Sequence, residues 1–98
     1  MIEIKDETEK VILVGVALSD QDDTKESLEE LKDLVSTAGA ETAGMLIQNR
    51  EQQHPATYVG KGKIEELKNM IWELRATGIV CDDELSPAQM KNLQDELD

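Results

Sequence analysis

The run Val11–Leu18 is the feature that most restricts what this chain can fold into. It is apolar at odd and even positions alike and rich in β-branched residues. At eight residues it is far too short to span a membrane. Such a run is typical of a strand that helices cover on both faces of a parallel sheet. The run therefore predicts an α/β fold.

Three further stretches are expected to be strands. Residues 42–50 place most of their apolar side chains on one alternating parity, and Ile79–Cys81 is a short apolar run. Thr57–Val59 is expected to form a third short strand just before Gly60. With the first run, these stretches predict a small, mainly parallel sheet of three to four strands flanked by helices.

Three helices are expected to alternate with these strands. The first is predicted for residues 23–38 and the second from position 61 or 62 to position 77, each followed by a glycine. The third begins at Ser86, with Pro87 at its first position and Gln89 completing a capping box. It is still unfinished at the last residue, as expected of a helix cut short by truncation.

Composition indicates one α/β domain over residues 1–98, with a core of aliphatic side chains. Tyr58 and Trp72 are the only aromatic residues. We expect Trp72 to extend the core-facing stripe of the second helix; the alternative is that it lies partly exposed as a docking point for a missing domain. The single Cys81 cannot form an internal disulfide and is expected to be buried, in a reducing compartment. No secretion signal is visible, so the predicted location is cytoplasmic, with no membrane partner.

The chain carries 22 acidic and 10 basic side chains, a net charge of −12. Its overall field therefore excludes autonomous nucleic-acid binding, and contact with phosphate requires a local basic patch or another domain. Much of the acidic charge falls on the expected solvent faces of helices.

Gly60, Lys61, Gly62 and Lys63 form the best candidate site. Glycines let the backbone approach an anion, a helix N-terminus offers free N–H groups, and the lysines, with Arg50, add positive charge. These features suit phosphate, in RNA or in a nucleotide. The spacing is not that of a P-loop. A purely structural, glycine-rich turn with two solvated lysines remains an equal alternative.

Other polar residues give weaker signals. His54 has no second histidine or nearby cysteine and is interpreted as a surface loop residue. Asp82 and Asp83 follow the last strand, where α/β sheets place ligands, so they are weak candidates for Mg²⁺. Alternatively, they favour the N-terminus of the next helix. No catalytic residues are assigned.

Several separated segments carry a family resemblance. Between about residues 28 and 97, the chain resembles the N-terminal domain of the HflX GTPases in motif order and spacing. The segments are Leu34–Ala40, Gln48, Pro55–Lys63, Asp82–Gln89 and Asn92–Leu93.

The resemblance implies a cytoplasmic, ribosome-associated GTPase that binds the large subunit and can split ribosomes under stress. In this family the α/β subdomain precedes a helical hairpin and a Ras-like G domain, and adenine-nucleotide activity has been proposed for it in some members. The 98 residues contain no GxxxxGK(S/T), DxxG or NKxD motif. GTP and Mg²⁺ would thus belong to the G domain of the parent protein, and this fragment is expected to be no enzyme and to hold no cofactor.

Two functional hypotheses follow. In the first, the chain is an interaction module that docks against ribosomal RNA or its own G domain, with Arg50, Lys61 and Lys63 contacting phosphate. In the second, it binds an adenine nucleotide or hydrolyses ATP, with the Gly60–Lys63 turn around the phosphates and Asp82 or Asp83 holding Mg²⁺.

Overall fold

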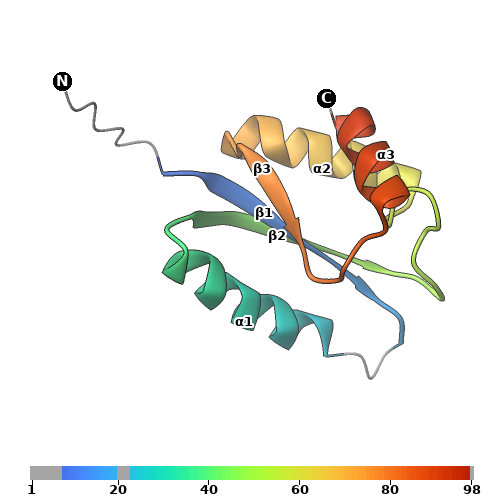
Figure 1. Cartoon of the computed structure of the whole chain (residues 1–98), viewed down its shortest axis with the longest axis horizontal. Helices are drawn as coiled ribbons and strands as arrows, with labels where there is room; N and C mark the ends of the chain where they lie inside the picture. The colour runs from blue at the N-terminus through green and yellow to red at the C-terminus, as the bar shows by residue number, and fades with distance from the viewer. Residues whose placement is uncertain (1–7, 20–22, 98) are drawn as a thin grey trace.

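The structure, a computed structural model, describes residues 8–19 and 23–97 and has three parallel strands in the order β2-β1-β3. Helix α1 covers one face of the sheet, and α2 and α3 cover the other (Figure 1). The elements are β1 Lys10–Ala17, α1 Thr24–Thr37, β2 Glu41–Asn49, α2 Lys61–Leu74, β3 Gly78–Cys81 and α3 Pro87–Leu97. The α/β fold predicted from the sequence is confirmed, with three strands and three helices in the described part of the chain.

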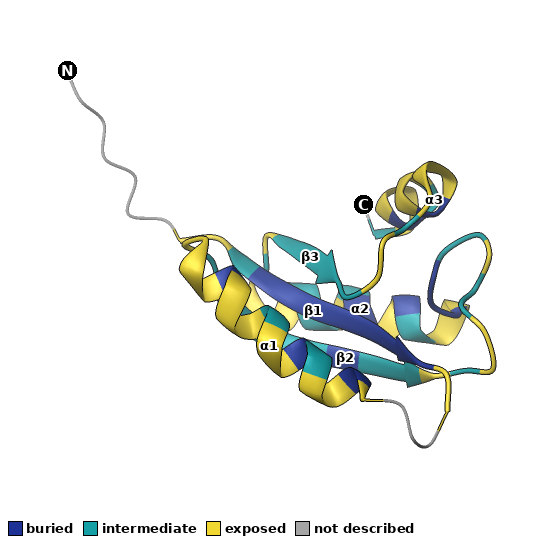
Figure 2. Cartoon of the chain, turned by 60° about the horizontal axis from the view of Figure 1, so that its bottom comes forward, coloured by how far each residue is buried: buried dark blue, intermediate teal, exposed yellow. Residues whose placement is uncertain are grey.

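Strand β1 is the centre of the molecule and is buried along almost its whole length (Figure 2). Its odd positions, such as Leu13, pack with Leu28 of α1. Its even positions, such as Ile12, pack with Leu67 of α2 and Leu93 of α3. Because side chains alternate between the two faces of a strand, a run that is apolar at every position must be covered twice. The interpretation of this run is therefore confirmed.

The topology places the carboxyl ends of all three strands at one edge of the sheet. From β1 the chain crosses through α1 to β2 on one side, and from β2 it crosses through α2 to β3 on the other. The winding direction therefore reverses between β1 and β3. In open α/β sheets, ligands bind beyond the carboxyl ends of the strands at this switch point.

The prediction of a strand at Thr57–Val59 is wrong. The structure has only an isolated antiparallel bridge between His54 and Tyr58 in this segment. The two residues exchange backbone N–H···O bonds of 3.0 and 2.9 Å, and Tyr58 has a φ of 69°. The segment closes on itself through these bonds and does not pair with the sheet.

The end of α2 also differs from the prediction. The helix stops at Leu74, and Arg75 takes the left-handed conformation that a glycine was expected to supply. Gly78 instead opens β3, where it pairs with Val11. Trp72, expected to face the core, is 84% exposed. Ile71 packs against the core, and the next side chain points about 100° away around the helix.

Predictions at the remaining termini are mostly confirmed. Gly39 follows α1 with a φ of 95°, as a helix stop requires. Asp23 precedes α1 but makes no capping bond. The capping box of α3 is present, because Ser86 N–H donates to Gln89 Oε1 at 3.0 Å and Gln89 N–H donates to Ser86 Oγ at 3.1 Å. No described helix is both long and apolar enough to cross a bilayer.

Candidate functional site

A tightly bonded turn, residues 54–59, leads into α2 and supports its N-terminus. Its central side chain, Tyr58, is fully buried and donates a hydrogen bond of 2.5 Å to Asp83 Oδ2. His54 Nδ1 accepts the N–H groups of Ala56 and Thr57 at 3.1 and 3.3 Å. The histidine is thus a structural acceptor inside the turn and is only partly exposed, where a surface loop residue was expected.

Helix α3 holds the same turn from outside. Gln89 Nε2 donates to the carbonyl oxygen of His54 at 3.0 Å, and Asn92 Nδ2 donates to that of Ala56 at 3.1 Å. Sequence patterns gave no signal for these long-range bonds. They fix the turn between β3 and α3, so that the start of α2 rests on a rigid base.

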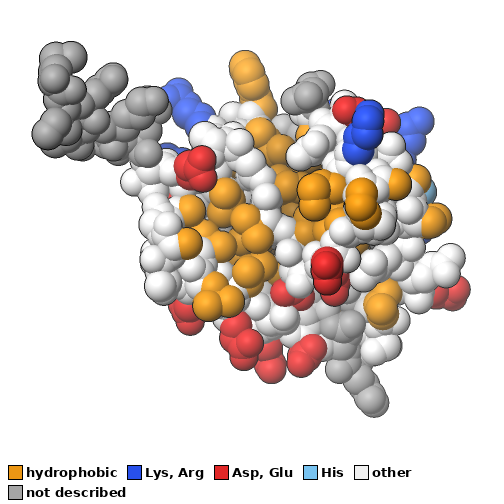
Figure 3. All heavy atoms as spheres, in the orientation of Figure 1, with side chains coloured by type: hydrophobic (Ala, Val, Ile, Leu, Met, Phe, Trp, Pro, Cys, Tyr) orange, Lys and Arg blue, Asp and Glu red, His pale blue; other side chains and the backbone are white. Residues whose placement is uncertain are grey.

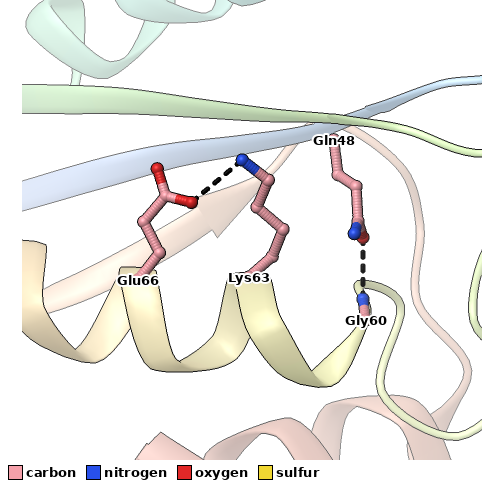
Figure 4. Close-up of polar contacts among 4 residues, drawn as sticks. All are labelled: Gln48, Gly60, Lys63 and Glu66. Carbon is pink, nitrogen blue, oxygen red and sulfur yellow. Dashed lines mark hydrogen bonds and ion pairs between the residues drawn. The ribbon is translucent and has the colours of Figure 1, made fainter.

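Gly60 lies at the junction of this turn with α2 and is buried. Its N–H donates to Gln48 Oε1 of β2 at 2.7 Å (Figure 4), so this amide is occupied within the domain. A Cβ added at Gly60 would lie 2.8 Å from Nη1 of Arg50. The absent side chain therefore lets the Arg50 guanidinium and the Gln48 amide reach the start of α2.

Lys61, Gly62 and Lys63 form the exposed first turn of α2. Their three backbone N–H groups have no hydrogen-bond partner among the described residues. A Cβ at Gly62 would meet nothing within 4 Å, so the backbone there is open to approach. Lys63 Nζ lies 2.9 Å from Glu66 Oε2, which offsets part of its charge (Figure 4). The structure thus places the Arg50 guanidinium beside Gly60, at the start of the turn formed by Lys61, Gly62 and Lys63, and anion binding there stays a prediction.

Asp82 and Asp83 lie elsewhere, at the carboxyl end of β3. Asp82 Oδ1 accepts a 2.9 Å hydrogen bond from Ser27 Oγ of α1, and Asp83 accepts the Tyr58 hydroxyl. The described residues contain no group of three or more histidine, cysteine or acidic side chains placed to hold a metal ion. The two carboxylates therefore act as acceptors that join α1 and the 54–59 turn to β3.

A polar cavity of about 280 Å³ opens beside these carboxylates, at the switch point between β1 and β3. Its lining is mainly polar, and it is the feature in which α/β folds most often hold a ligand. It is lined by Val16, Leu18, Asp23, Thr24, Ser27, Gln53, Asp82 and Asp83.

The Tyr58 hydroxyl and the Cys81 thiol both lie near Asp83 and both have a raised pKa. Burial, followed by the hydrogen bond and the charge of Asp83, raises the pKa of Tyr58 well above its usual value. Burial and then the same carboxylate raise the pKa of the Cys81 thiol to about 11. Cys81 is only half-buried, not fully buried as expected, yet its thiol stays protonated at neutral pH. A neutral thiol is a poor nucleophile, so Cys81 is not activated for covalent chemistry.

Comparison with known proteins identifies the family. The family model described as "GTP-binding GTPase N-terminal" matches residues 25–98. A protein named GTPase HflX from Lacrimispora saccharolytica is 62% identical over all 98 residues. The chain belongs to the family of HflX N-terminal domains. The resemblance seen in the sequence motifs is thereby confirmed.

More distant HflX proteins align over nearly the whole chain as well. The GTPase HflX of Caldanaerobacter subterraneus is 43% identical over 97 residues, and that of Escherichia coli K12 is 35% identical over 94 residues. The chain covers 99% and 96% of its own length in these alignments, but spans only 22–23% of the length of the three relatives. The activity named for those proteins therefore belongs to molecules about four times longer.

Proposed function

We propose that this domain is a non-catalytic interaction module that helps to position a ribosome-binding, cytoplasmic HflX-type GTPase on the large ribosomal subunit. The observation that supports it is the first turn of α2, where Lys61 and Lys63 accompany three N–H groups that have no partner within residues 8–19 and 23–97. The guanidinium of Arg50 lies next to Gly60 at the same place. GTP and Mg²⁺ binding would belong to a G domain elsewhere in the parent protein.

The electrostatics of the domain favour a small, oriented contact. With a net charge of −12, most of its surface repels RNA, so phosphate is admitted only where cations gather. Acidic side chains line the lower edge in Figure 3, where α1 runs, whereas the lysine and arginine side chains seen in this view lie in the upper part, together with further acidic ones. The hydrogen bonds from α3 to the 54–59 turn hold the backbone N–H groups of the α2 N-terminus in place before contact, which reduces the entropy lost on binding.

The test is ribosome binding by the full-length protein over a series of salt concentrations. Lys61→Ala combined with Lys63→Ala should weaken binding and flatten its salt dependence, because each phosphate contact contributes roughly 0.7–0.9 to the slope. Lys25→Ala with Lys32→Ala, two exposed lysines of α1, is the matched control with the same change in charge. Equal binding and equal slopes for the two double variants would remove the proposal.

A second candidate function is supported by the 280 Å³ cavity at the switch point. Here the domain binds an adenine nucleotide, with phosphates at the Lys61–Lys63 amides and Mg²⁺ at Asp82 or Asp83. The bonded amide of Gly60 and the ion pair of Lys63 weigh against it, and so does the cavity lining, which includes Asp82 and Asp83 but none of residues 60–63. The test is calorimetry of the 98-residue chain with ATP and Mg²⁺. A heat of binding that is lost in the Asp82→Asn variant supports nucleotide binding. The absence of any heat of binding at millimolar nucleotide excludes it.

A further inference from the structure

Strand β3 lies at one edge of the sheet but has the sequence of an interior strand. Its residues Gly78–Cys81 are apolar on both alternating faces, with no lysine, proline or acidic side chain among them. Edge strands usually carry such residues, because an unprotected edge pairs with other chains. All four residues of β3 are only half-buried, whereas β1 is buried from Val11 to Ala17. The composition of β3 therefore suits a strand with a neighbour on each side.

The outer backbone groups of β3 face no strand within residues 8–19 and 23–97. Asp82 N–H donates to the carbonyl oxygen of Val14 at 2.9 Å, so the even-numbered positions of β3 direct their N–H groups toward β1. Because backbone groups alternate in direction along a strand, Ile79 and Cys81 direct theirs away from β1. These two residues present hydrogen-bond donors and acceptors along a free edge.

An apolar groove runs beside this edge, between β3 and α3. One part of about 430 Å³ and an adjoining part of about 440 Å³ share Ile79, Gln94 and Leu97 in their linings. The first part also includes Leu85 and Leu93. Figure 3 shows hydrophobic side chains gathered on the face where Figure 1 draws β3 and α3. Aliphatic side chains next to unpaired backbone groups form the kind of surface to which an added β-strand binds.

The opposite face of β3 is incompletely covered as well. Val80 packs with the core cluster under α1 but is only half-buried. Leu34 of α1 is 66% exposed and shares a side of the helix with Ser27, seven residues before it. Ser27 Oγ donates to Asp82 at the end of β3, so this side of α1 faces the β3 edge. A strand beside β3 would meet apolar side chains on both faces of the sheet.

The position of α3 indicates which segment supplies that strand. The chain passes from β1 through α1 to β2 in one direction across the sheet, and from β2 through α2, on the other face, to β3 in the opposite direction. The two crossovers therefore have the same hand, as parallel connections do. Since α3 lies on the same face as α2, a further crossover of this hand leads from β3 away from β1. A parallel strand that follows α3 would then lie at the free edge of β3.

We propose that the segment following residue 98 in the longer protein forms a fourth parallel strand beside β3 and fills the groove with apolar side chains. The family model described as N-terminal matches as far as residue 98, and this chain spans only 22–23% of the length of its relatives, so most of their sequence lies beyond this point. Strand β3 has four residues, so a partner of roughly 13 Å spans its edge. The inference goes beyond the proposed function and does not depend on ribosome binding.

Amide hydrogen exchange measured by NMR tests this strand at single residues. The 98-residue chain is compared with the same chain extended by the next roughly 20 residues of its parent protein, enough for a short loop and a strand. Exchange at Ile79 and Cys81 should slow by about a hundredfold or more on extension, because their N–H groups gain partners.

The outer edge of β2 is the matched control in the same molecule. Arg50 N–H donates to the carbonyl oxygen of Ala17, so the odd-numbered Met45 and Ile47 direct their N–H groups away from β1. Exchange at these two residues should remain fast in both chains.

A substitution in the groove provides a second measurement. Leu97→Ala removes a side chain that both parts of the groove share. Its effect on the urea midpoint should be at least about twofold larger in the extended chain, where the side chain is covered. Leu74→Ala is the control, because Leu74 is 40% exposed and lies near Gly44 of β2, and it should have the same effect in both chains.

Slowed exchange at Ile79 and Cys81 with an unchanged β2 edge supports the fourth strand, and equal exchange in the two chains overturns it. Protection that appears in the 98-residue chain and grows with its concentration would mean that a second copy covers the edge, and would also overturn it. So would protection that appears only in the full-length protein, since another domain would then cover β3. None of these outcomes involves Lys61 or Lys63, so the proposed function is tested separately.

Discussion

The hydroxyl of Tyr58 donates a hydrogen bond of 2.5 Å to Asp83 Oδ2, and this bond joins the 54–59 turn to the end of β3. Tyr58 is fully buried and has a left-handed backbone, with a φ of 69°. Few non-glycine residues adopt that conformation unless the surroundings hold it there. Burial and the Asp83 bond together supply that restraint, and they set the position from which α2 begins.

We predict that Tyr58→Phe lowers the free energy of unfolding by about 1–2 kcal/mol. The change removes a hydrogen bond to a charged acceptor while it retains the buried ring. Asp83 is exposed, so water replaces the lost donor and keeps the effect in this range. Urea unfolding measures the change, and Asp83→Asn, which keeps an acceptor oxygen, should cost less. A Tyr58→Phe protein as stable as the parent would show that the bond does not hold the turn.

Stability should fall as the pH rises from about 9 toward 11. The folded-state pKa of Cys81 is raised from its usual 9.0 to about 11, and that of Tyr58 is raised further. Groups with a raised pKa stabilise the fold fully below their unfolded pKa, and that contribution is lost as the pH approaches the folded value. Cys81→Ser removes one of these titrations, so its unfolding free energy, measured by urea titration at pH 8, 9.5 and 11, should decline less steeply. If the free energy of unfolding declines equally with pH in both proteins, the raised pKa of Cys81 does not contribute to stability.

The same substitution at two glycines should have opposite effects. A Cβ at Gly15 in β1 would lie 2.7 Å from Cγ2 of the buried Thr24, so Gly15→Ala should destabilise by about 1–3 kcal/mol. A Cβ at Gly62 meets nothing within 4 Å, so Gly62→Ala should stabilise by up to about 1 kcal/mol through helix propensity. Thermal unfolding of the two variants compares them directly, and each serves as the control for the other. Shifts of the same sign would show that one of the two environments is misjudged.

The capping box of α3 should contribute to stability in two separable parts. Ser86→Ala removes the acceptor for the Gln89 N–H and should cost about 1 kcal/mol. Gln89→Glu keeps an acceptor for the Ser86 N–H but removes the donor to the His54 carbonyl. The loss of stability in this variant therefore measures the contribution of the hydrogen bond to the 54–59 turn. Ser36→Ala, on the exposed face of α1, should change stability by less than about 0.5 kcal/mol. If Ser86→Ala and Ser36→Ala have the same free energy of unfolding in urea, the capping box does not stabilise α3.

Local patterns were sufficient for most elements of the fold. The double-faced apolar run predicted a strand covered by helices on both faces, because only such a strand can bury every side chain. Gly39 and the Ser86–Gln89 box marked helix ends correctly, since both signals act within a few residues of the backbone they terminate. Lys61 and Lys63 could be proposed as a candidate site from the sequence alone, since they lie close together in an acidic chain.

The sequence by itself thus determined the class of fold, the succession of most strands and helices along the chain, and where α2 begins, but not the order of the strands in the sheet. The tertiary structure decided what depends on contacts between distant segments. In the folded chain the buried Tyr58 donates a hydrogen bond to Asp83, and the Gly60 N–H donates one to Gln48. The Trp72 side chain faces solvent. Periodicity fixes which side of a helix is apolar, but a residue at the margin of that stripe, or a polar side chain without a local partner, takes its role from whatever the fold brings beside it.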